Sequence, residues 1–119
     1  MTAGSGLIHA EVSSEEFKNQ GGDLEILQLW VNLPAKHKMA TPKYLGLQKS
    51  DIPTVKLDND KISVQVVSGD FFGTKGAFST FTDIHLATIF CQPGGQITLN
   101  IPTEHNICLL YTSPSPRDS

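Results

Sequence analysis

The amino-acid sequence predicts an all-β protein, a sandwich or a barrel, on three observations. Apolar and polar residues alternate over Leu7–Val12, Ile62–Val67 and Gln96–Ile101, which is the period of a strand with one buried face. Leu24–Leu33 is almost continuously apolar, as expected for a strand covered on both faces. Short strands separated by turn residues are typical of sandwiches and barrels, so we expect this fold class.

The remaining elements follow from shorter local signals. Between the first two predicted strands, Ser13 and Glu16 form a capping-box pattern that predicts one helical turn. A second helical turn is expected around Ser50–Ile52, where the proline that follows limits it. Ile84–Cys91 is predicted to be a strand. Gln92–Gly95 after it is predicted to be a type II turn, because Pro stands at its second position and Gly at its third.

Composition and charge argue against several classes of protein. The chain has 119 residues, 39% hydrophobic and 18% charged, with a formal net charge of −3. Its scattered lysines form no basic run that would attract nucleic-acid phosphates. No apolar stretch approaches the roughly 20 residues that span a bilayer, and no secretory signal is visible. Two cysteines without a CxxC spacing favour a reducing cytoplasm. We therefore expect a cytoplasmic protein that binds neither nucleic acid directly nor membranes.

His9 and Glu11 are the candidate functional residues. They stand two residues apart on the first predicted strand, so their side chains are expected to point to the same face. An imidazole and a carboxylate on one face could together hold a divalent metal. Periodicity alone favours a simpler explanation, an amphipathic strand whose polar side faces water. Two ligands also do not complete a site, and the chain supplies no obvious third.

The other histidines and the tryptophan predict no further site. His37 stands among lysines and is expected to be solvated, and His105 lies near the C-terminal tail. His85 alternates with apolar neighbours, so we expect it to face away from the core. Trp30, a lone tryptophan in an apolar strand, is assigned to the core. No nucleophile and base can be paired from these scattered positions.

Residues 108–119 do not belong to the strand pattern. The sequence changes abruptly there from strand-like to rich in Pro and Ser, and CLLYTSPSPRD resembles the read-through translation of a sequencing adapter. We interpret this tail as an artefact and exclude it from the fold prediction.

Several segments together resemble the pirin family of two-domain, or bicupin, proteins. MTAGSGLIHAE is similar to the family's second metal-binding motif, and LQLWVNLPAKHKM, PKYLGLQKSDIP and VVSGDFFG follow in the family's order. DIHLATIFCQPGGQITLNIP is similar to the start of the second barrel. The resemblance covers residues 1–107. It narrows the expected fold to a cupin-like double-stranded β-barrel, or jelly-roll, as part of a bicupin.

The resemblance implies a division of the chain into four regions. Residues 1–41 would form the C-terminal part of the first, metal-binding cupin domain, and residues 42–60 the connector between domains. Residues 61–107 would begin the second cupin domain, and residues 108–119 are the artefact tail. The first half of barrel one and most of barrel two would then be missing, so the chain is expected to be a fragment.

The resemblance also implies a metal site. Pirin-like proteins bind one metal through three histidines and one glutamate, and His9 and Glu11 match the last two of these ligands. The other two histidines belong to an HxH motif expected upstream of this chain. The implied cofactor is a divalent metal, Fe(II) before others, at a site that is incomplete here.

The activity that the resemblance implies is that of a flavonol (quercetin) dioxygenase in the intact protein. Glu11 would be a catalytic base as well as a ligand, acting on a small aromatic, flavonol-like substrate in a protein that is monomeric when intact. The alternative is a metal-dependent transcriptional cofactor or protein-binding module without turnover. Whether the parent is an enzyme stays open at this point, and the fragment itself is expected to be inactive.

Overall fold

A computed structural model of the chain describes residues 1–111, which are rich in strand and extended structure and contain little helix. The helical parts are the α-helix α1 (Glu15–Gln20) and the 3-10 helices η1 (Ala35–His37) and η2 (Lys49–Asp51). The strands are β1 (Thr54–Leu57), β2 (Ile62–Ser68), β3 (Asp70–Phe71), β4 (Thr74–Lys75) and β5 (Leu86–Cys91).

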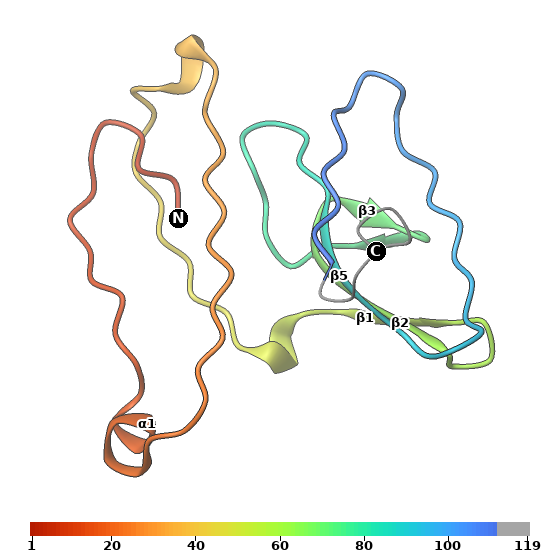
Figure 1. Cartoon of the computed structure of the whole chain (residues 1–119). Helices are drawn as coiled ribbons and strands as arrows, with labels where there is room; N and C mark the ends of the chain where they lie inside the picture. Colours follow the sequence, from red (N-terminus) through yellow and green to blue (C-terminus); the bar gives the residue numbers. More distant parts are fainter. Residues whose placement is uncertain (112–119) are drawn as a thin grey trace, which may run out of the picture.

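The organising element is a three-stranded antiparallel sheet in the order β1-β2-β5 (Figure 1). Val64 at the centre of β2 lies opposite Val55 of β1 and Ile89 of β5. The register between β2 and β5 shifts between Val66 and Ser68, which marks a bulge where the ladder ends. β3 and β4 form a separate two-stranded hairpin immediately after β2.

The hydrophobic core is built around β2. Ile62, Val64 and Val66 are fully buried, and Phe71 of β3 joins them at 8% exposure. The predicted alternation over Ile62–Val67 is therefore confirmed, because the apolar side chains share the buried face. Partly buried apolar side chains from β1, β5 and the segment after the β5 turn pack against this cluster: Val55, Leu57, Ala87, Ile89, Ile97, Leu99 and Ile101.

The turn after β5 has the predicted type II character. The Gly95 backbone N–H donates to the Gln92 carbonyl at 2.9 Å, and Gly94 has φ = 80°. A positive φ at the third position is what a type II turn requires. The strand predicted over Gln96–Ile101 is not a hydrogen-bonded strand, although its apolar side chains reach the core as expected.

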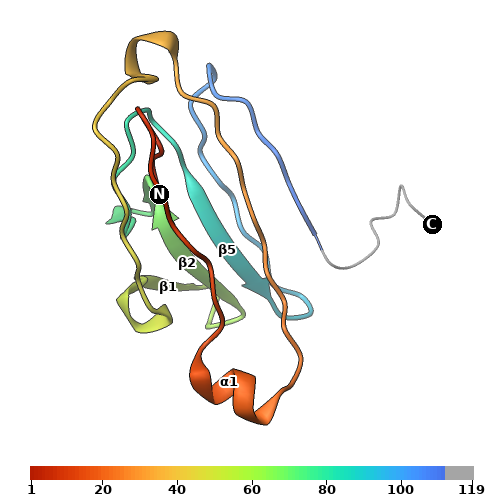
Figure 2. The same cartoon turned by 90° about the vertical axis from the view of Figure 1, so that its left-hand side faces the viewer.

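The first 48 residues run as extended segments that are joined by α1 and η1, coloured red to yellow in Figures 1 and 2. Thr2 and Lys43 exchange backbone hydrogen bonds of 2.7 and 2.9 Å, forming an isolated antiparallel bridge. The strands predicted over Leu7–Val12 and Leu24–Leu33 are not present as hydrogen-bonded strands. Both predictions are wrong for one reason: the segments are extended, but no neighbouring strand in the described chain pairs with them.

The apolar side chains of this N-terminal region are exposed. Trp30 is 86% exposed, so its assignment to the core is wrong. The side chains on both faces of its segment, including Ile26 and Leu27, are also open to solvent. No other element of residues 1–111 covers either face, which is what burial would have required.

The helical turns differ slightly from prediction. The N-cap of α1 is Ser14 rather than Ser13, and its Oγ accepts the Phe17 backbone N–H at 3.1 Å. Gly21 ends the helix at φ = 68°, with its N–H donating to the Phe17 carbonyl. η2 forms where the second turn is predicted. β1 lies within the region expected to be a connector, where the sequence gives little periodicity.

The described strands do not form a closed barrel, so the jelly-roll stays a prediction for a complete domain. Within residues 1–111 no helix has both the length and the apolar character needed to cross a membrane. The part of the predicted artefact tail from residue 112 onward lies outside the described residues.

Candidate metal centres

The predicted pair His9 and Glu11 lies together on one side of the N-terminal segment. His9 Nε2 is 3.8 Å from Glu11 Oε1, and the two side chains are 32% and 67% exposed. The second carboxylate oxygen of Glu11 accepts a long hydrogen bond of 3.5 Å from Gln28 Nε2. The His9 ring is tilted toward Tyr44, with 6.4 Å between ring centroids. The spacing argument is confirmed for their shared face, whereas their role as ligands stays a prediction.

A tight bend at Gly4 directs the chain into this segment. Gly4 has φ = 51°, and a Cβ there would overlap the Ala40 carbonyl group. The bend is closed by two backbone hydrogen bonds, from Ser5 N–H to Ala40 and from Gly6 N–H to Ala3. Only glycine combines this backbone conformation with so close an approach. In the described residues no third histidine, cysteine or carboxylate completes a set with His9 and Glu11.

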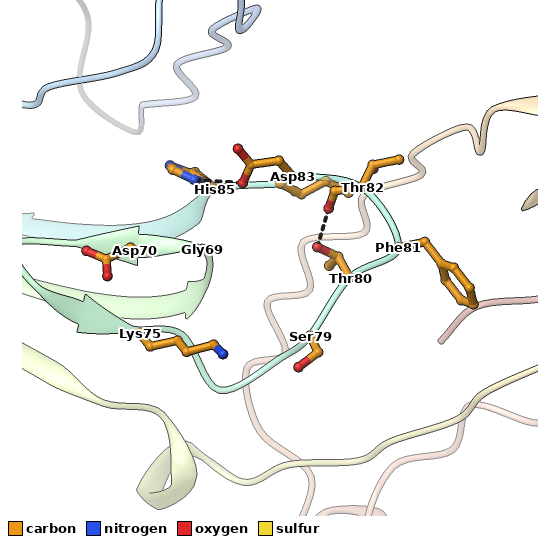
Figure 3. Close-up of a pocket in the computed structure, with 10 residues that line it drawn as sticks. Gly69, Asp70, Lys75, Ser79, Thr80, Phe81, Thr82, Asp83 and His85 are labelled. Atoms are coloured by element: carbon orange, nitrogen blue, oxygen red, sulfur yellow. Dashed lines mark hydrogen bonds and ion pairs between the residues drawn. The ribbon is translucent and has the colours of Figure 1, made fainter.

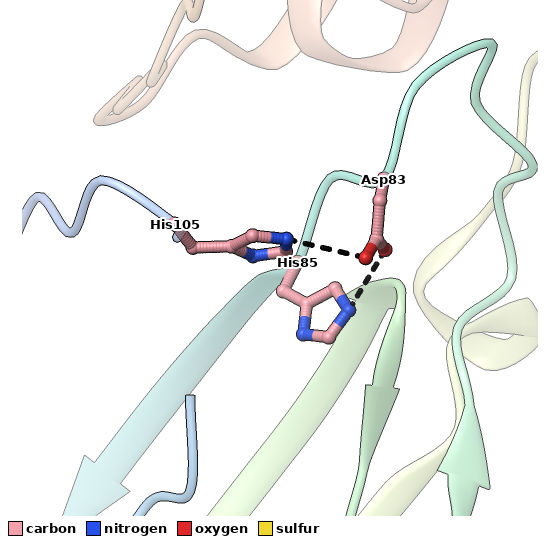
Figure 4. A group of neighbouring side chains, drawn as sticks. All are labelled: Asp83, His85 and His105. Atoms are coloured by element: carbon pink, nitrogen blue, oxygen red, sulfur yellow. Dashed lines mark hydrogen bonds and ion pairs between the residues drawn. The ribbon is translucent and has the colours of Figure 1, made fainter. Parts of the chain in front are cut away.

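A second group of possible ligands, which the sequence did not predict, consists of Asp83, His85 and His105 (Figure 4). Asp83 Oδ1 is 3.0 Å from His85 Nε2, and Asp83 Oδ2 is 3.2 Å from His105 Nε2. One ligand atom from each residue lies within 4.8 Å of the others. Two imidazole nitrogens thus converge on one carboxylate, and the three residues could hold a metal ion.

The packed sheet positions this group. His85 immediately precedes β5, and its ring lies so close to Gly69 that a Cβ on Gly69 would overlap it. The same ring packs against Phe71, with 5.7 Å between centroids, and meets the edge of the His105 ring at 5.2 Å. The prediction that His85 faces away from the core is wrong, since its side chain is only 18% exposed. A turn closed by the His105 N–H and the Pro102 carbonyl presents the second ring.

An open cavity of about 450 Å³ lies beside the group (Figure 3). Asp83 and His85 line it together with Asp70, Lys75 and the loop that leads to β5. Within that loop, the Thr80 hydroxyl donates to the carbonyl oxygen of Thr82. The cavity gives solvent and small ions access to the Asp83 carboxylate.

One signal in the sequence points to part of this group. Asp83 and His85 have the same two-residue spacing as His9 and Glu11, which places a carboxylate and an imidazole close together on extended chain. His105 carries no such signal, because it reaches the pair only after β5, its turn and a long extended return.

Curated relatives place the chain in a family. It is 36% identical over 110 residues to a protein of Pseudomonas aeruginosa named "Putative quercetin 2,3-dioxygenase", and 40% identical over 106 residues to Pirin-like protein 2 of Arabidopsis thaliana. It is 37% identical over 102 residues to human Pirin. These alignments cover 92%, 89% and 86% of this chain. The chain belongs to the pirin family.

The pirin relatives are much longer than the region they share with this chain. The alignments cover 38%, 30% and 33% of the three relatives, so the chain spans about a third of their length. No family model matches the chain, and no solved structure matches it. The family assignment therefore rests on these pirin sequences, and it confirms the resemblance seen in the motifs.

Proposed function

We propose that the chain is part of a pirin-like, metal-binding cupin protein that acts as a flavonol (quercetin) dioxygenase when intact. The observation that carries the proposal is the side-by-side placement of His9 and Glu11, the two residues that match the family's metal-binding motif. The name of the Pseudomonas relative supports this choice of activity. We also propose, as the sequence predicts, that the intact protein is cytoplasmic and monomeric.

The donor atoms of this pair fit a divalent metal. A neutral imidazole nitrogen and a carboxylate oxygen suit Fe(II) and other first-row ions. The 3.8 Å between them exceeds the roughly 3 Å expected of neighbouring ligands on one ion. Glu11 is largely exposed and is held only by its long contact with Gln28, so side-chain rotation can close this gap. Two further ligands would have to come from outside the described residues.

A divalent metal held by the pair would supply Lewis acidity toward a flavonol hydroxyl and a redox-active centre. The contribution of the chain itself is to hold and move a proton. Glu11 Oε1 faces His9 and is the oxygen we expect to bind the metal, while Oε2, which accepts the long hydrogen bond from Gln28, is the oxygen we expect to accept the hydroxyl proton. Tyr44 lies beside the His9 ring, with 6.4 Å between the ring centroids.

The test is oxygen uptake with quercetin by an iron-loaded full-length protein that contains this segment. His9→Ala and Glu11→Ala should each lower turnover by roughly 10²-fold or more, the first because a metal ligand is lost and the second because the base is lost as well. Glu16→Ala is the matched control, because this exposed glutamate on α1 lies outside the pair, and turnover should not change.

Unchanged uptake in Glu11→Ala would refute the proposed role of the carboxylate. Absence of uptake by a protein that binds iron would favour the alternative function, a metal-dependent transcriptional cofactor or protein-binding module. The 119-residue chain alone is expected to show no uptake, since it offers the metal only two of the four expected ligands.

A further inference from the structure

We propose that Asp83, His85 and His105 form a second divalent-metal site, separate from the His9–Glu11 pair, that takes Zn²⁺ or another first-row ion through two imidazole nitrogens and the Asp83 carboxylate. This inference does not rest on the proposed dioxygenase function. It rests on the geometry of the three side chains and on the part of the fold that holds them.

The separations between ligand atoms match those around a single ion. Metal–nitrogen and metal–oxygen distances of about 2.0–2.2 Å place neighbouring ligands about 3.0 Å apart at right angles and about 3.4 Å apart in a tetrahedron. Asp83 Oδ1 lies 3.0 Å from His85 Nε2 and Asp83 Oδ2 lies 3.2 Å from His105 Nε2, so each imidazole nitrogen is in this range of one carboxylate oxygen. The third separation, between the histidine nitrogens, is within 4.8 Å and can shorten by small rotations of the rings.

Burial distinguishes this group from an ordinary surface ion pair. The side chains of His85 and His105 are only 18% and 20% exposed, and Phe71 and Gly69 restrict the His85 ring. Rings that are already held lose little freedom when they bind an ion. Asp83 is 66% exposed and faces the open cavity, so an ion has a route to the site.

The ligand set predicts what kind of site this is. Two histidines and one carboxylate with open positions are typical of mononuclear sites that bind water or a substrate as well. His85 Nδ1 is buried without a hydrogen-bond partner in the described chain, so the usual acceptor behind a ligating histidine is missing. Such an acceptor is typically worth about 10–100-fold in metal affinity. We therefore expect weaker binding than in a fully supported zinc site.

The experiment titrates Co²⁺ into the 119-residue chain carrying His9→Gln and Glu11→Gln, which removes the first pair. Ligand-field absorption reports nitrogen coordination, and calorimetry with Zn²⁺ reports the stoichiometry. About one ion per chain should still bind, because the second site is intact. Loss of all binding by this chain, with its amide spectrum unchanged, would overturn the proposal.

Asp83→Asn in the same background tests the carboxylate. The substitution preserves shape and removes the charged ligand from an exposed position, so the sheet should remain folded. Affinity should fall by at least about tenfold. Asp70→Asn is the matched control, because Asp70 lines the same cavity without belonging to the group. An equal loss in the control would mean that only the general negative charge attracts the ion, and would overturn the site.

His105→Gln tests the ligand that is distant in sequence, with His37→Gln as the control. Long-range ¹H–¹⁵N spectra of the imidazoles provide a readout independent of affinity. On saturation with Zn²⁺, the Nε2 resonances of His85 and His105 should shift together, while that of His37 should not. Undiminished binding by a folded His105→Gln chain, or a shift confined to His37, would refute the assignment.

Discussion

Two regions of this chain have similar strand-like sequences and very different packing. The fully or almost fully buried side chains of the described residues all lie between Ile62 and Phe71, on β2 and the hairpin after it. In residues 1–48 no side chain is buried, although Leu24–Leu33 is more continuously apolar than β2. Figure 1 shows the N-terminal segments standing apart from the sheet. Apolar periodicity alone therefore does not decide where a core forms.

The difference lies in hydrogen-bonded partner strands. β2 is joined to β1 by a tight turn in which Asp58, Asn59 and Asp60 all have positive φ, and β5 pairs with its other edge. Both neighbours pair with the backbone of β2, and Phe71 and the apolar side chains of residues 97–101 pack against its buried face. Leu24–Leu33 has no such neighbour in the described residues, and all its side chains except Leu33 are exposed.

The two candidate metal centres repeat this contrast. His9 and Glu11 lie on the open N-terminal segment, 3.8 Å apart, with few contacts to hold them. Asp83, His85 and His105 lie at the edge of the packed sheet with separations of 3.0 and 3.2 Å. A site supported by packed elements is better preorganised than one on unsupported chain.

The largest effect is expected from placing a charge in each region. Val64→Asp buries a carboxylate at the centre of β2, where the side chain has no exposure, and should cost on the order of 4 kcal/mol or more of unfolding free energy. Val12→Asp places the same group where the side chain is 78% exposed and should change stability by less than about 0.5 kcal/mol. Urea unfolding followed by circular dichroism compares them. Similar losses in both variants would show that the N-terminal region is packed after all.

A smaller effect is expected from adding one methyl group in each region. In Gly76→Ala, the new Cβ would overlap the backbone of Ser68 at the buried end of β2, which should cost about 1–3 kcal/mol. In Gly46→Ala, the Cβ meets only a Tyr44 ring carbon at 3.9 Å, an ordinary contact. The second variant should be neutral or slightly stabilising, because alanine restricts the unfolded chain. Thermal unfolding measures both, and a loss at Gly46 equal to that at Gly76 would contradict the comparison.

The sequence predicted those parts of the fold that depend on neighbours along the chain. β2, β5 and the type II turn after β5 follow from period-two alternation and from the placement of Pro93 and Gly94. Alternation also predicted a strand over Leu7–Val12, and continuous apolarity predicted one over Leu24–Leu33, but neither segment forms a hydrogen-bonded strand. Alternation indicates which face a strand would bury, and it carries no information about whether a partner strand is present. β1 was not predicted because it has only four residues, too few to show an alternating pattern among the surrounding lysines and prolines.

The candidate sites divide in the same way. The proximity of His9 and Glu11 follows from their spacing on extended chain, and the structure confirms it. Asp83 and His85 share that spacing, but the group is complete only when His105 is brought beside them by β5 and the chain that returns after it. A single sequence does not give the length and direction of that return, so the second site needed the structure.

The smallest effect is expected at the N-cap of α1. Ser14→Ala removes the acceptor for the Phe17 N–H, a contact worth about 1 kcal/mol to a helix. α1 has six residues and none of them is buried, so the loss should stay local. The Cα shifts of α1 should move toward coil values and the Phe17 amide should exchange faster, while the urea midpoint of the sheet stays unchanged. Ser13→Ala is the control and should alter neither. A shifted midpoint in Ser14→Ala would mean that the N-terminal region and the sheet unfold together, which their difference in burial argues against.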